Sequence, residues 1–535
     1  MQSFFQHRRL REAAKTDVDK LHAHGDSPAA SQAASEANFA EEGKLQRAQE
    51  HSIAGVNISD PSEYDGSTTY EVGWADGDPE NPQNWSLVQK WSATTTVSFI
   101  LLAVSIPSSI DAPVSDQFNK HYGVGPIAGS MTTGMYLIGI GVGSMVAAPF
   151  SETFGRNLVY LTTMVIFILF TIGKALAPNY GAAIVFRFFA GFFGAAPLTV
   201  GSGTVADIWG PLEITFSLPF VTLTSYGGPI LGPIISAYLP DIGYRWADWI
   251  SAIFAGVILI LVFLFQPETY SPTLLEWRAS HLCELTGDPR FCSQGHASAG
   301  LLGRRLLTNM LRPFSLTYTE PIILVFSFYL TILYIVLFTF LNGFPFIFGD
   351  TYGISNSLTF LIFTALLVGD FVAILLIPIV YGWTKKASVR AADRGQNLAP
   401  EVCLYFAMLG GSILMPISIF WIGWTCYPSV SIWVPIIGVV VFGYSLVTVF
   451  TTTYNYIVFV YLQYAGSALS FMTFSRYVIS GALLPASVPM YKNLGPHFTL
   501  TWVGVLAALM APLPFLLYKY GHQIRAMSKN VQNQT

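Results

Sequence analysis

The chain carries twelve apolar segments, each long enough to cross a lipid bilayer, in two groups of six that one charged stretch separates. A backbone in lipid must satisfy its own hydrogen bonds, so an apolar run of about 20 residues predicts a spanning helix. The stretch from Val402 to Ser475 holds no Asp, Glu, Lys or Arg. A soluble domain of that composition could not stay in solution. The sequence therefore predicts an all-α membrane protein with twelve transmembrane helices.

The apolar segments also predict how the chain is organised. We expect spanning helices at 92–110, 127–149, 157–177, 182–206, 214–238, 248–266, 320–344, 356–381, 402–424, 432–456, 466–488 and 498–518. They form an N-terminal six-helix bundle (89–266) and a C-terminal six-helix bundle (320–518), with a central loop (267–319) between them. The tail at 1–88 is rich in Ala, Ser, Glu and Asp, and we expect it to be disordered. A short tail (519–535) follows the last helix.

Composition excludes several classes of function. Charged residues make up 11% of the chain, far below the average of about 25% in soluble proteins. The net charge is −4 and the basic residues lie mostly in loops, so we expect no nucleic-acid partner. The four cysteines lack metal-ligand spacing. We find no catalytic-serine turn and no intramembrane histidine cluster, and expect neither an enzyme nor a bound metal or cofactor.

Basic residues in the loops predict the orientation. Most of the loop Lys and Arg residues, among them Arg156, Arg278 and Lys385, fall on one side of the predicted membrane. Because cytosolic loops carry an excess of Lys and Arg, this side should be cytosolic. Both tails and the central loop would then lie in the cytosol.

Charged residues inside the predicted helices are candidates for function, because burying charge in a bilayer is costly. Asp370 is the single carboxylate that we expect deep within a helix. A desolvated carboxyl can exchange protons near neutral pH, which favours a role in proton coupling, and a structural ion pair is the alternative. Arg476 lies midway along its helix, which suggests the substrate cavity, and pairing with Asp370 is conceivable. For Lys174, near a helix end, we expect the side chain to reach the membrane interface.

Several short motifs point to one family. They are Pro149-Phe-Ser-Glu152-Thr-Phe-Gly155-Arg156-Asn157, Asn81-Pro-Gln-Asn-Trp-Ser86, Arg187-Phe-Phe-Ala-Gly191, Gly228-Pro229-Ile-Leu-Gly232-Pro233 and Pro267-Glu-Thr-Tyr-Ser-Pro-Thr-Leu-Leu275. From about residue 70 to 527 the chain resembles the major facilitator superfamily. Within it, the chain is similar to the fungal 12-helix drug:proton antiporter branch, which contains polyamine, fluconazole-type and cercosporin-type exporters. It departs from the family pattern at Glu152, where Asp is usual, and at Pro233-Ile234, where a second Gly-Gly is expected.

The resemblance implies the major facilitator fold and roles for particular residues. Arg187 matches an arginine implicated in proton coupling, and a structural clamp is the alternative. The resemblance also implies a latch that holds the cytosolic side closed, formed by Glu152, Gly155, Arg156 and Asp207. A plain surface ion pair is the alternative.

Two further groups follow from the resemblance and from the aromatic helices. Gly228, Pro229 and Gly232 look like the helix-5 antiporter motif, which permits bending and seals the two halves, and tight packing is a compatible reading. Asn455 and Tyr456 resemble the family's Asn-Tyr pair. With Arg476 and Tyr329, which lies in an aromatic-rich helix, they are our candidates for the substrate cavity.

These observations predict a secondary transporter that exports a small amphiphilic compound and uses the proton gradient as its energy source. The cargo would be a xenobiotic, a secondary metabolite such as a mycotoxin, or an organic acid. Because Lys174, Arg187 and Arg476 outnumber Asp370 inside the membrane, neutral or anionic cargo is favoured over a polyamine. An importer or facilitator, and a non-transporting nutrient sensor, are the alternatives. We expect a monomer in the plasma membrane, with the vacuolar membrane as second choice.

Overall fold

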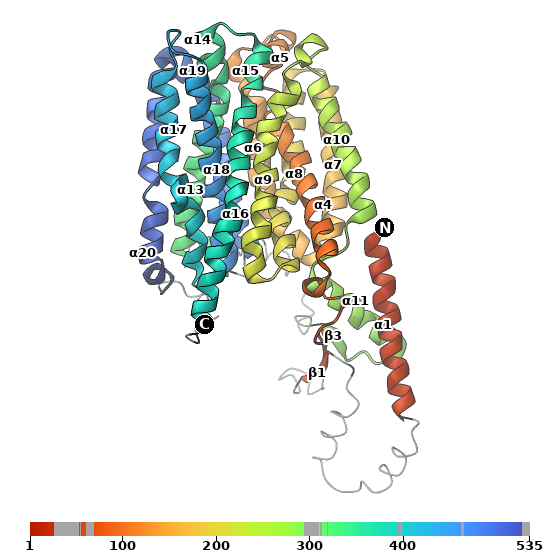
Figure 1. The fold of residues 1–535 in the computed structure, drawn as a ribbon. Coiled ribbons are helices and arrows are strands. Elements are labelled where there is room, and N and C mark those ends of the chain that lie inside the picture. The colour runs from red at the N-terminus through yellow and green to blue at the C-terminus, as the bar shows by residue number, and fades with distance from the viewer. Residues whose placement is uncertain are drawn as a thin grey trace.

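The structure is a computed structural model that describes residues 1–25, 53, 55–59, 69–293, 310, 313–317, 319–393, 395, 399–461 and 465–526. A tall bundle of helices stands on a smaller layer that carries the N-terminus (Figure 1). We call the end of the bundle that meets this layer the tail end, and the opposite end the far end.

The N-terminal half of the bundle runs from residue 87 to 265. Its elements are α4 (Leu87–Ser105), η2 (Ile106–Ser108), α5 (Ser115–Tyr122), α6 (Pro126–Phe154), α7 (Arg156–Ala175), α8 (Tyr180–Ile208), α9 (Pro211–Ser236), η3 (Leu239–Asp241) and α10 (Trp246–Phe265). Before α4 lies the single turn η1 (Pro82–Asn84), and a capping box between Ser86 and Gln89 begins α4. The short helix α5 lies at the far end (Figure 1).

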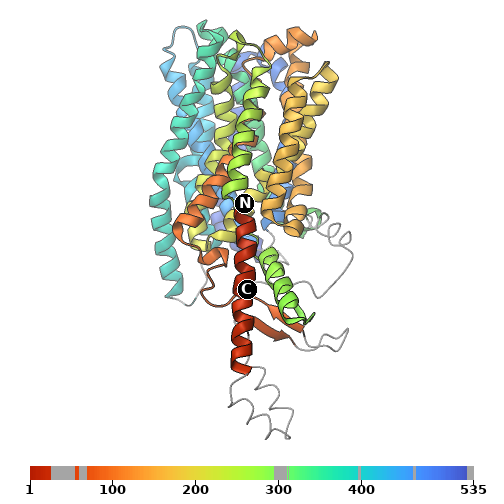
Figure 2. The ribbon, with the colours of Figure 1, turned by 90° about the vertical axis from the view of Figure 1, so that its right-hand side faces the viewer.

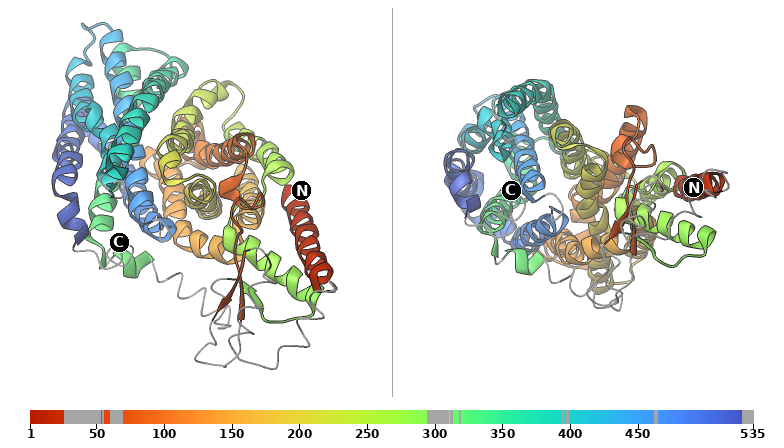
Figure 3. Two further views of the ribbon diagram at one scale, coloured as in Figure 1. Left: turned by 60° about the horizontal axis from the view of Figure 1, so that its bottom comes forward. Right: turned by 90° about the horizontal axis from the view of Figure 1, so that it is seen from below.

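The C-terminal half follows the central segment. Its elements are α13 (Pro321–Phe344), η4 (Pro345–Gly349), α14 (Asp350–Tyr352), α15 (Asn356–Leu361), α16 (Phe363–Ala392), η5 (Pro400–Leu404), η6 (Ala407–Gly411), α17 (Ser412–Thr425), α18 (Trp433–Tyr461), α19 (Ala465–Met510) and α20 (Leu513–Ala526). Viewed from the tail end, the helices of the two halves form two groups side by side (Figure 3).

Among the described residues, eleven helical stretches are long and apolar enough to cross a membrane. The last of them, Gly466–Arg525, has 60 residues, more than twice what a bilayer requires. It turns at Gly495 (φ 74°, ψ 168°), so it contains both helices that the sequence predicts at 466–488 and 498–518. The predicted all-α membrane fold is confirmed, and the difference in number comes from this one continuous stretch.

Glycines allow the helices to approach backbone to backbone. A Cβ atom on Gly139 of α6 would lie 2.2 Å from the Phe188 carbonyl oxygen of α8. Between the two halves, Gly134 of α6 and Gly481 of α19 face each other in the same way, with a Cβ on Gly134 2.6 Å from the Gly481 carbonyl oxygen. In lipid no hydrophobic effect drives helices together, and small residues at helix contacts are the usual means by which they associate closely.

The layer at the tail end differs from the expected disordered tail. It holds α1 (Gln2–Gly25), α11 (Ser271–Thr286) and a sheet of β1 (Val56–Ser59), β2 (Thr69–Val72) and β3 (Phe291–Ser293). The sheet order is β1-β2-β3, with β1 antiparallel and β3 parallel to β2. Helices α1 and α11 lie side by side below the bundle (Figure 2).

Contacts with the central segment explain why α1 is ordered. Ala14 and Val18 of α1 are buried against Leu275 and Leu282 of α11. Arg278 of α11 also forms ion pairs of 3.1 Å with Asp17 and with Asp78. The apolar partner of α1 is more than 250 residues away in the sequence, so the composition of the tail alone indicates disorder. Residues 26–52 and 60–68 of the predicted disordered tail lie outside the described residues.

The packing of α6 on α8 gives a matched test. We expect Gly139→Ala to lower the stability of the protein by about 1–3 kcal/mol, because the new Cβ meets backbone that cannot yield without moving a helix. In Gly256→Ala of α10 the new Cβ has no atom of the described residues within 4 Å, so that variant should be neutral or slightly stabilising. Unfolding temperatures of the purified variants in detergent measure both effects. Equal unfolding temperatures for the two variants would contradict this packing.

Candidate functional site

The two halves enclose a cavity of about 310 Å³ at the far end. Its polar lining includes Asp111 and Lys174 from the N-terminal half and Asn342 and Lys492 from the C-terminal half. The pocket between the halves at the tail end has about 10 Å³, barely the space for one water molecule. The halves are therefore closed together at the tail end and leave room at the far end.

Four charged side chains gather beside this cavity, and we call them the four-charge cluster. Lys174 Nζ lies 2.8 Å from both Asp111 Oδ2 and Asp248 Oδ1. Arg187 Nη2 lies 2.9 Å from Asp111 Oδ2, and Arg187 also donates a hydrogen bond to the Pro107 carbonyl oxygen. Two cations and two carboxylates balance one another, which offsets much of the cost of burying each charge.

The cluster corrects one expectation from the sequence and adds residues that the sequence argument missed. Lys174 does not reach the membrane interface: its side chain is 3% exposed and is held by two carboxylates. The sequence argument also missed that carboxylates at helix boundaries are buried: the Asp248 side chain is 2% exposed. Asp248 stands in the first turn of α10 and Asp111 follows η2, so both look like boundary residues in the sequence. The signal that could have found them is the pair of cations, Lys174 and Arg187, in two neighbouring helices.

Asp370 lies on α16, in contact with α18, and is 1% exposed. Neither of its carboxyl oxygens has a hydrogen-bond partner among the described residues. The conceivable pair with Arg476 does not form in this structure: no described ion pair involves either residue. The neighbouring Gly369 brings α16 and α18 close, since a Cβ there would lie 2.1 Å from the Val440 carbonyl oxygen. Asp370 is therefore buried beside a close contact between α16 and α18.

The predicted cavity residues do not line the cavity at the far end. Asn455 lines the small pocket at the tail end, and Tyr456 and Tyr329 are buried between helices. Arg476 is 2% exposed and is surrounded by aromatic rings. These residues lie deeper than the cavity or towards the tail end.

At the tail end, Arg156 and Asp207 are brought together, as the family resemblance implies. Arg156 Nε lies 3.1 Å from Asp207 Oδ2, and Arg156 Nη1 donates a hydrogen bond of 2.6 Å to Ser151 Oγ. The guanidinium also lies over the Tyr270 ring, 4.6 Å from its centre. Glu152 lies beside Gly466 of α19, in the other half. The contacts of Arg156 with Ser151 and Asp207 connect α6, α7 and α8 next to the junction of the halves.

Glu268 is a residue of this region that the sequence argument did not single out. Its carboxylate accepts hydrogen bonds from the backbone N–H groups of Arg156, Asn157, Thr269 and Tyr270, at 2.9–3.0 Å. Burial raises the pKa of the Glu268 carboxyl, and the four N–H donors oppose that rise. The carboxylate caps the start of α7, where helix N–H groups have no intrahelical partner. The sequence feature that could have pointed to Glu268 is the motif Pro267-Glu268-Thr.

The same residue ties the tail layer to the bundle. Gln6 of α1 donates a hydrogen bond from Nε2 to the Glu268 carbonyl oxygen (3.2 Å) and accepts one at Oε1 from the Glu268 N–H (3.0 Å). Gly155, with φ 88°, passes so close that a Cβ would lie 2.7 Å from Glu268 Oε2. Helix α1 thus contacts the backbone of the residue that caps α7 and positions Arg156.

Helix α9 packs closely on α4 and η2 through its small residues. A Cβ on Gly228 would lie 1.9 Å from Ser105 Oγ, and one on Gly232 would lie 2.7 Å from the Ile106 carbonyl oxygen. Ser109 Oγ donates a hydrogen bond of 2.7 Å to the Pro229 carbonyl oxygen. That oxygen has no helical donor, because Pro233, four residues later in α9, has no N–H group. The close-packing reading of these residues is confirmed.

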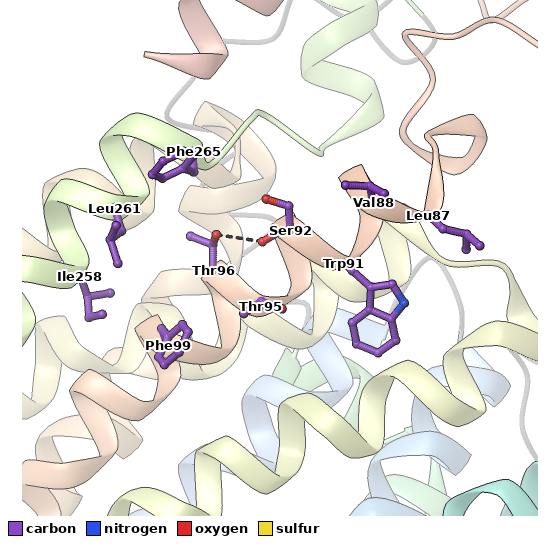
Figure 4. A pocket seen from close by; sticks show the side chains of 10 residues that line it. All are labelled: Leu87, Val88, Trp91, Ser92, Thr95, Thr96, Phe99, Ile258, Leu261 and Phe265. Carbon is purple, nitrogen blue, oxygen red and sulfur yellow. Dashed lines mark hydrogen bonds between the residues drawn. The ribbon is translucent and has the colours of Figure 1, made fainter.

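A second groove runs along the outer surface between α4 and α10 (Figure 4). Leu87, Val88 and Phe265 line it with more than half of each side chain exposed. Thr96 Oγ1, one of its few polar atoms, donates to the Ser92 carbonyl oxygen at 2.9 Å. This apolar groove lies on the bundle's outer face rather than between the halves.

Comparison with known proteins agrees with this geometry. Residues 93–485 match the model of the Major Facilitator Superfamily. The chain is 42% identical over 494 residues to the MFS-type transporter kojT of Aspergillus flavus, covering 91% of this chain and 87% of that protein. It is 34% identical to the MFS-type efflux pump MFS2 of Trichophyton rubrum, covering 87% of this chain and 79% of that protein.

Solved structures share the fold at low sequence identity. The proton:xylose symporter XylE matches with a TM-score of 0.59 and 14% identity, covering 82% of this chain and 96% of that one. The human organic anion transporter MFSD10 matches with a TM-score of 0.51 and 17% identity, covering 79% and 99%. The chain is a multi-pass membrane transporter of small molecules, not an enzyme, and it belongs to the major facilitator superfamily.

Proposed function

We propose that this transporter exports a small organic compound in exchange for protons. The observation that carries the proposal is Asp370, a carboxyl group buried in the bundle with no hydrogen-bond partner among the described residues. An ionised carboxylate there would be uncompensated in a medium of low dielectric, which is far more costly than the neutral acid. Asp370 therefore holds a proton in this conformation and must meet water or another proton acceptor before it can release it.

The orientation supports export towards the far end. Helices α16 and α20 end at the tail end of the bundle (Figure 1), and their last turns carry Lys385, Lys386, Arg390 and Arg525. By the positive-inside rule this end faces the cytosol. The far-end cavity then faces the outside, which in the plasma membrane is the side from which protons enter. The relative in Trichophyton rubrum carries the name of an efflux pump, which agrees with this direction. We place this monomeric transporter in the plasma membrane, with the vacuolar membrane as second choice.

The structure suggests how protons and cargo share one cycle. In the conformation described here the tail end is closed, and Asp111 and Lys174 line the far-end cavity, from which protons would enter the bundle. Asp370 lies seven residues beyond Phe363 of the cavity wall, about 10 Å along α16. When the halves close at the far end and separate at the tail end, Asp370 loses its proton to the cytosol and cargo is loaded. Arg187 acts through the four-charge cluster, whose ion pairs hold α7, α8 and α10 together beside the proton path.

The test of this proposal is export at two external pH values. We expect yeast that lacks its own exporters and expresses the chain to lose fluorescent organic compounds faster at low external pH, and a protonophore to abolish the difference. Asp370→Asn should remove the dependence on pH, because the amide cannot carry a proton. Asp241→Asn, at an exposed position in η3, serves as the matched control and should behave like the wild type.

The contrary outcomes separate the alternatives. Full export by Asp370→Asn with unchanged pH dependence would remove Asp370 from the mechanism. Accumulation instead of loss of compound would favour an importer or facilitator. Binding without any movement of compound would favour a sensor.

We further propose that Arg156 and Asp207 form a latch, which closes the tail end in one state and opens in the other. Cys403, buried in the small tail-end pocket, can report this opening by its rate of reaction with a maleimide once Cys283, Cys292 and Cys426 are replaced by Ser. We expect Asp207→Asn to raise that rate several-fold, since it removes one partner of the 3.1 Å ion pair. Glu284→Gln on α11, whose ion pair is exposed, should leave it unchanged. Equal labelling rates in the two variants would reduce the latch to a structural contact.

A further inference from the structure

Arg476 stands apart from the other cations that the structure describes inside the bundle. Lys174 and Arg187 share Asp111 and Asp248, and Arg156 has Asp207. Arg476 has no ion pair among the described residues, although it is 2% exposed. Within the part of the chain that the structure describes, its Nε and Nη1 atoms have no hydrogen-bond partner, and Nη2 donates one long bond of 3.3 Å to Thr473 Oγ1.

Such a residue is expensive for the protein. A guanidinium group keeps its proton at any physiological pH, so it cannot escape burial by becoming neutral. A buried charge without a partner lowers the stability of the fold, and such groups persist where function requires them. The missing partner of Arg476 is therefore an anion that the described chain does not supply.

Aromatic rings surround the guanidinium and define what else fits there. The ring centres of Tyr334, Phe450, Tyr477 and Tyr454 lie 4.7, 5.0, 5.0 and 5.3 Å from its central carbon. We call these four rings and Arg476 the aromatic cage. Their faces attract the cation, and they equally offer flat apolar surface to a molecule that lies against them.

The cage lies at the junction of the two halves. The rings belong to α13, α18 and α19 of the C-terminal half, and Tyr226 of α9 covers them from the N-terminal half. The Tyr226 ring centre is 4.2 Å from that of Phe450 and 5.9 Å from that of Tyr334. One turn away, Thr222 of α9 and Thr451 of α18 share a hydrogen bond of 2.9 Å. Separation of the halves at the tail end would withdraw Tyr226 and uncover Arg476.

We propose that the aromatic cage is the cargo site, that Arg476 binds a negatively charged group of the cargo, and that the cargo is a small organic anion with an aromatic or otherwise apolar body. This deepens the proposed function and rests on the chain being a transporter with alternating access. No described carboxylate pairs with this guanidinium, which repels polycations, so the proposal excludes polyamines. A carboxylate or enolate gains two unshared N–H donors and a full positive charge.

A purely structural Arg476, held by cation–π contacts, makes the opposite prediction for stability. Without cargo, our proposal expects Arg476→Met to unfold at the same temperature as the wild type or higher, because it removes an uncompensated charge and keeps the apolar contact. The matched control is Arg187→Met, which removes a paired arginine and leaves Asp111 with one cation fewer. That variant should unfold several degrees lower.

The binding test uses benzoate, phenylacetate and hexanoate with their neutral amides, added to the purified full-length protein at pH 7. We expect at least one anion to raise the unfolding temperature of the wild type, its amide to have less than a tenth of that affinity, and Arg476→Met to lose the response. Loss of stability in Arg476→Met comparable to that in Arg187→Met overturns the proposal. So does equal binding of anion and amide, or failure of every anion to bind the wild type better than the variant.

The same variants separate this inference from the proposed function. Anion binding that depends on Arg476, together with export indifferent to the proton gradient, would refute proton coupling and leave the cargo site standing. Proton-driven export that is unchanged in Arg476→Met would refute the cargo site and leave proton coupling standing.

Discussion

The cost of placing charge inside a bilayer is the constraint on which this structure depends. The N-terminal half meets it by balance: Lys174 and Arg187 are matched by Asp111 and Asp248 within a single network. The C-terminal half does not, because Asp370 and Arg476 are both buried and neither has an ionic partner among the described residues. Asp370 can avoid the cost by holding a proton, whereas Arg476 cannot. The N-terminal half therefore buries its charge in pairs, and the C-terminal half buries these two groups without an ionic partner among the described residues.

The contacts that would control alternating access lie at the tail end. Glu268 caps α7 with its carboxylate, Arg156 at the start of α7 meets Asp207 of α8, and Gln6 of α1 meets the backbone of Glu268. These three contacts form one chain of interactions from the N-terminal helix to the junction of the halves. A small shift of α11 or α1 would also displace Arg156, because packed helices and hydrogen-bonded caps transmit displacement rather than absorb it.

The sequence predicted the features that a bilayer imposes and missed those that depend on distant contacts. Apolar segments located the helices, and the family resemblance correctly implied contact between Arg156 and Asp207. The sequence did not show that Asp111 and Asp248 are functional candidates, because each stands at a helix boundary, where water would normally solvate a carboxylate. The order of α1 was also hidden, since Ala14 and Val18 are buried only when α11 supplies their partner. Whether Asp370 meets Arg476 depends on which way two helices turn, and periodicity in an all-apolar segment does not fix that rotation.

Infrared difference spectroscopy of the purified protein at neutral pH tests the central claim most directly, because a protonated carboxyl group has its own C=O stretching band. The account predicts such a band in the wild type, its absence in Asp370→Asn, and its loss from the wild type when cargo drives the transporter towards the state open at the tail end. A spectrum without a protonated carboxyl band, or one that Asp370→Asn leaves unchanged, would contradict the claim that Asp370 carries the proton.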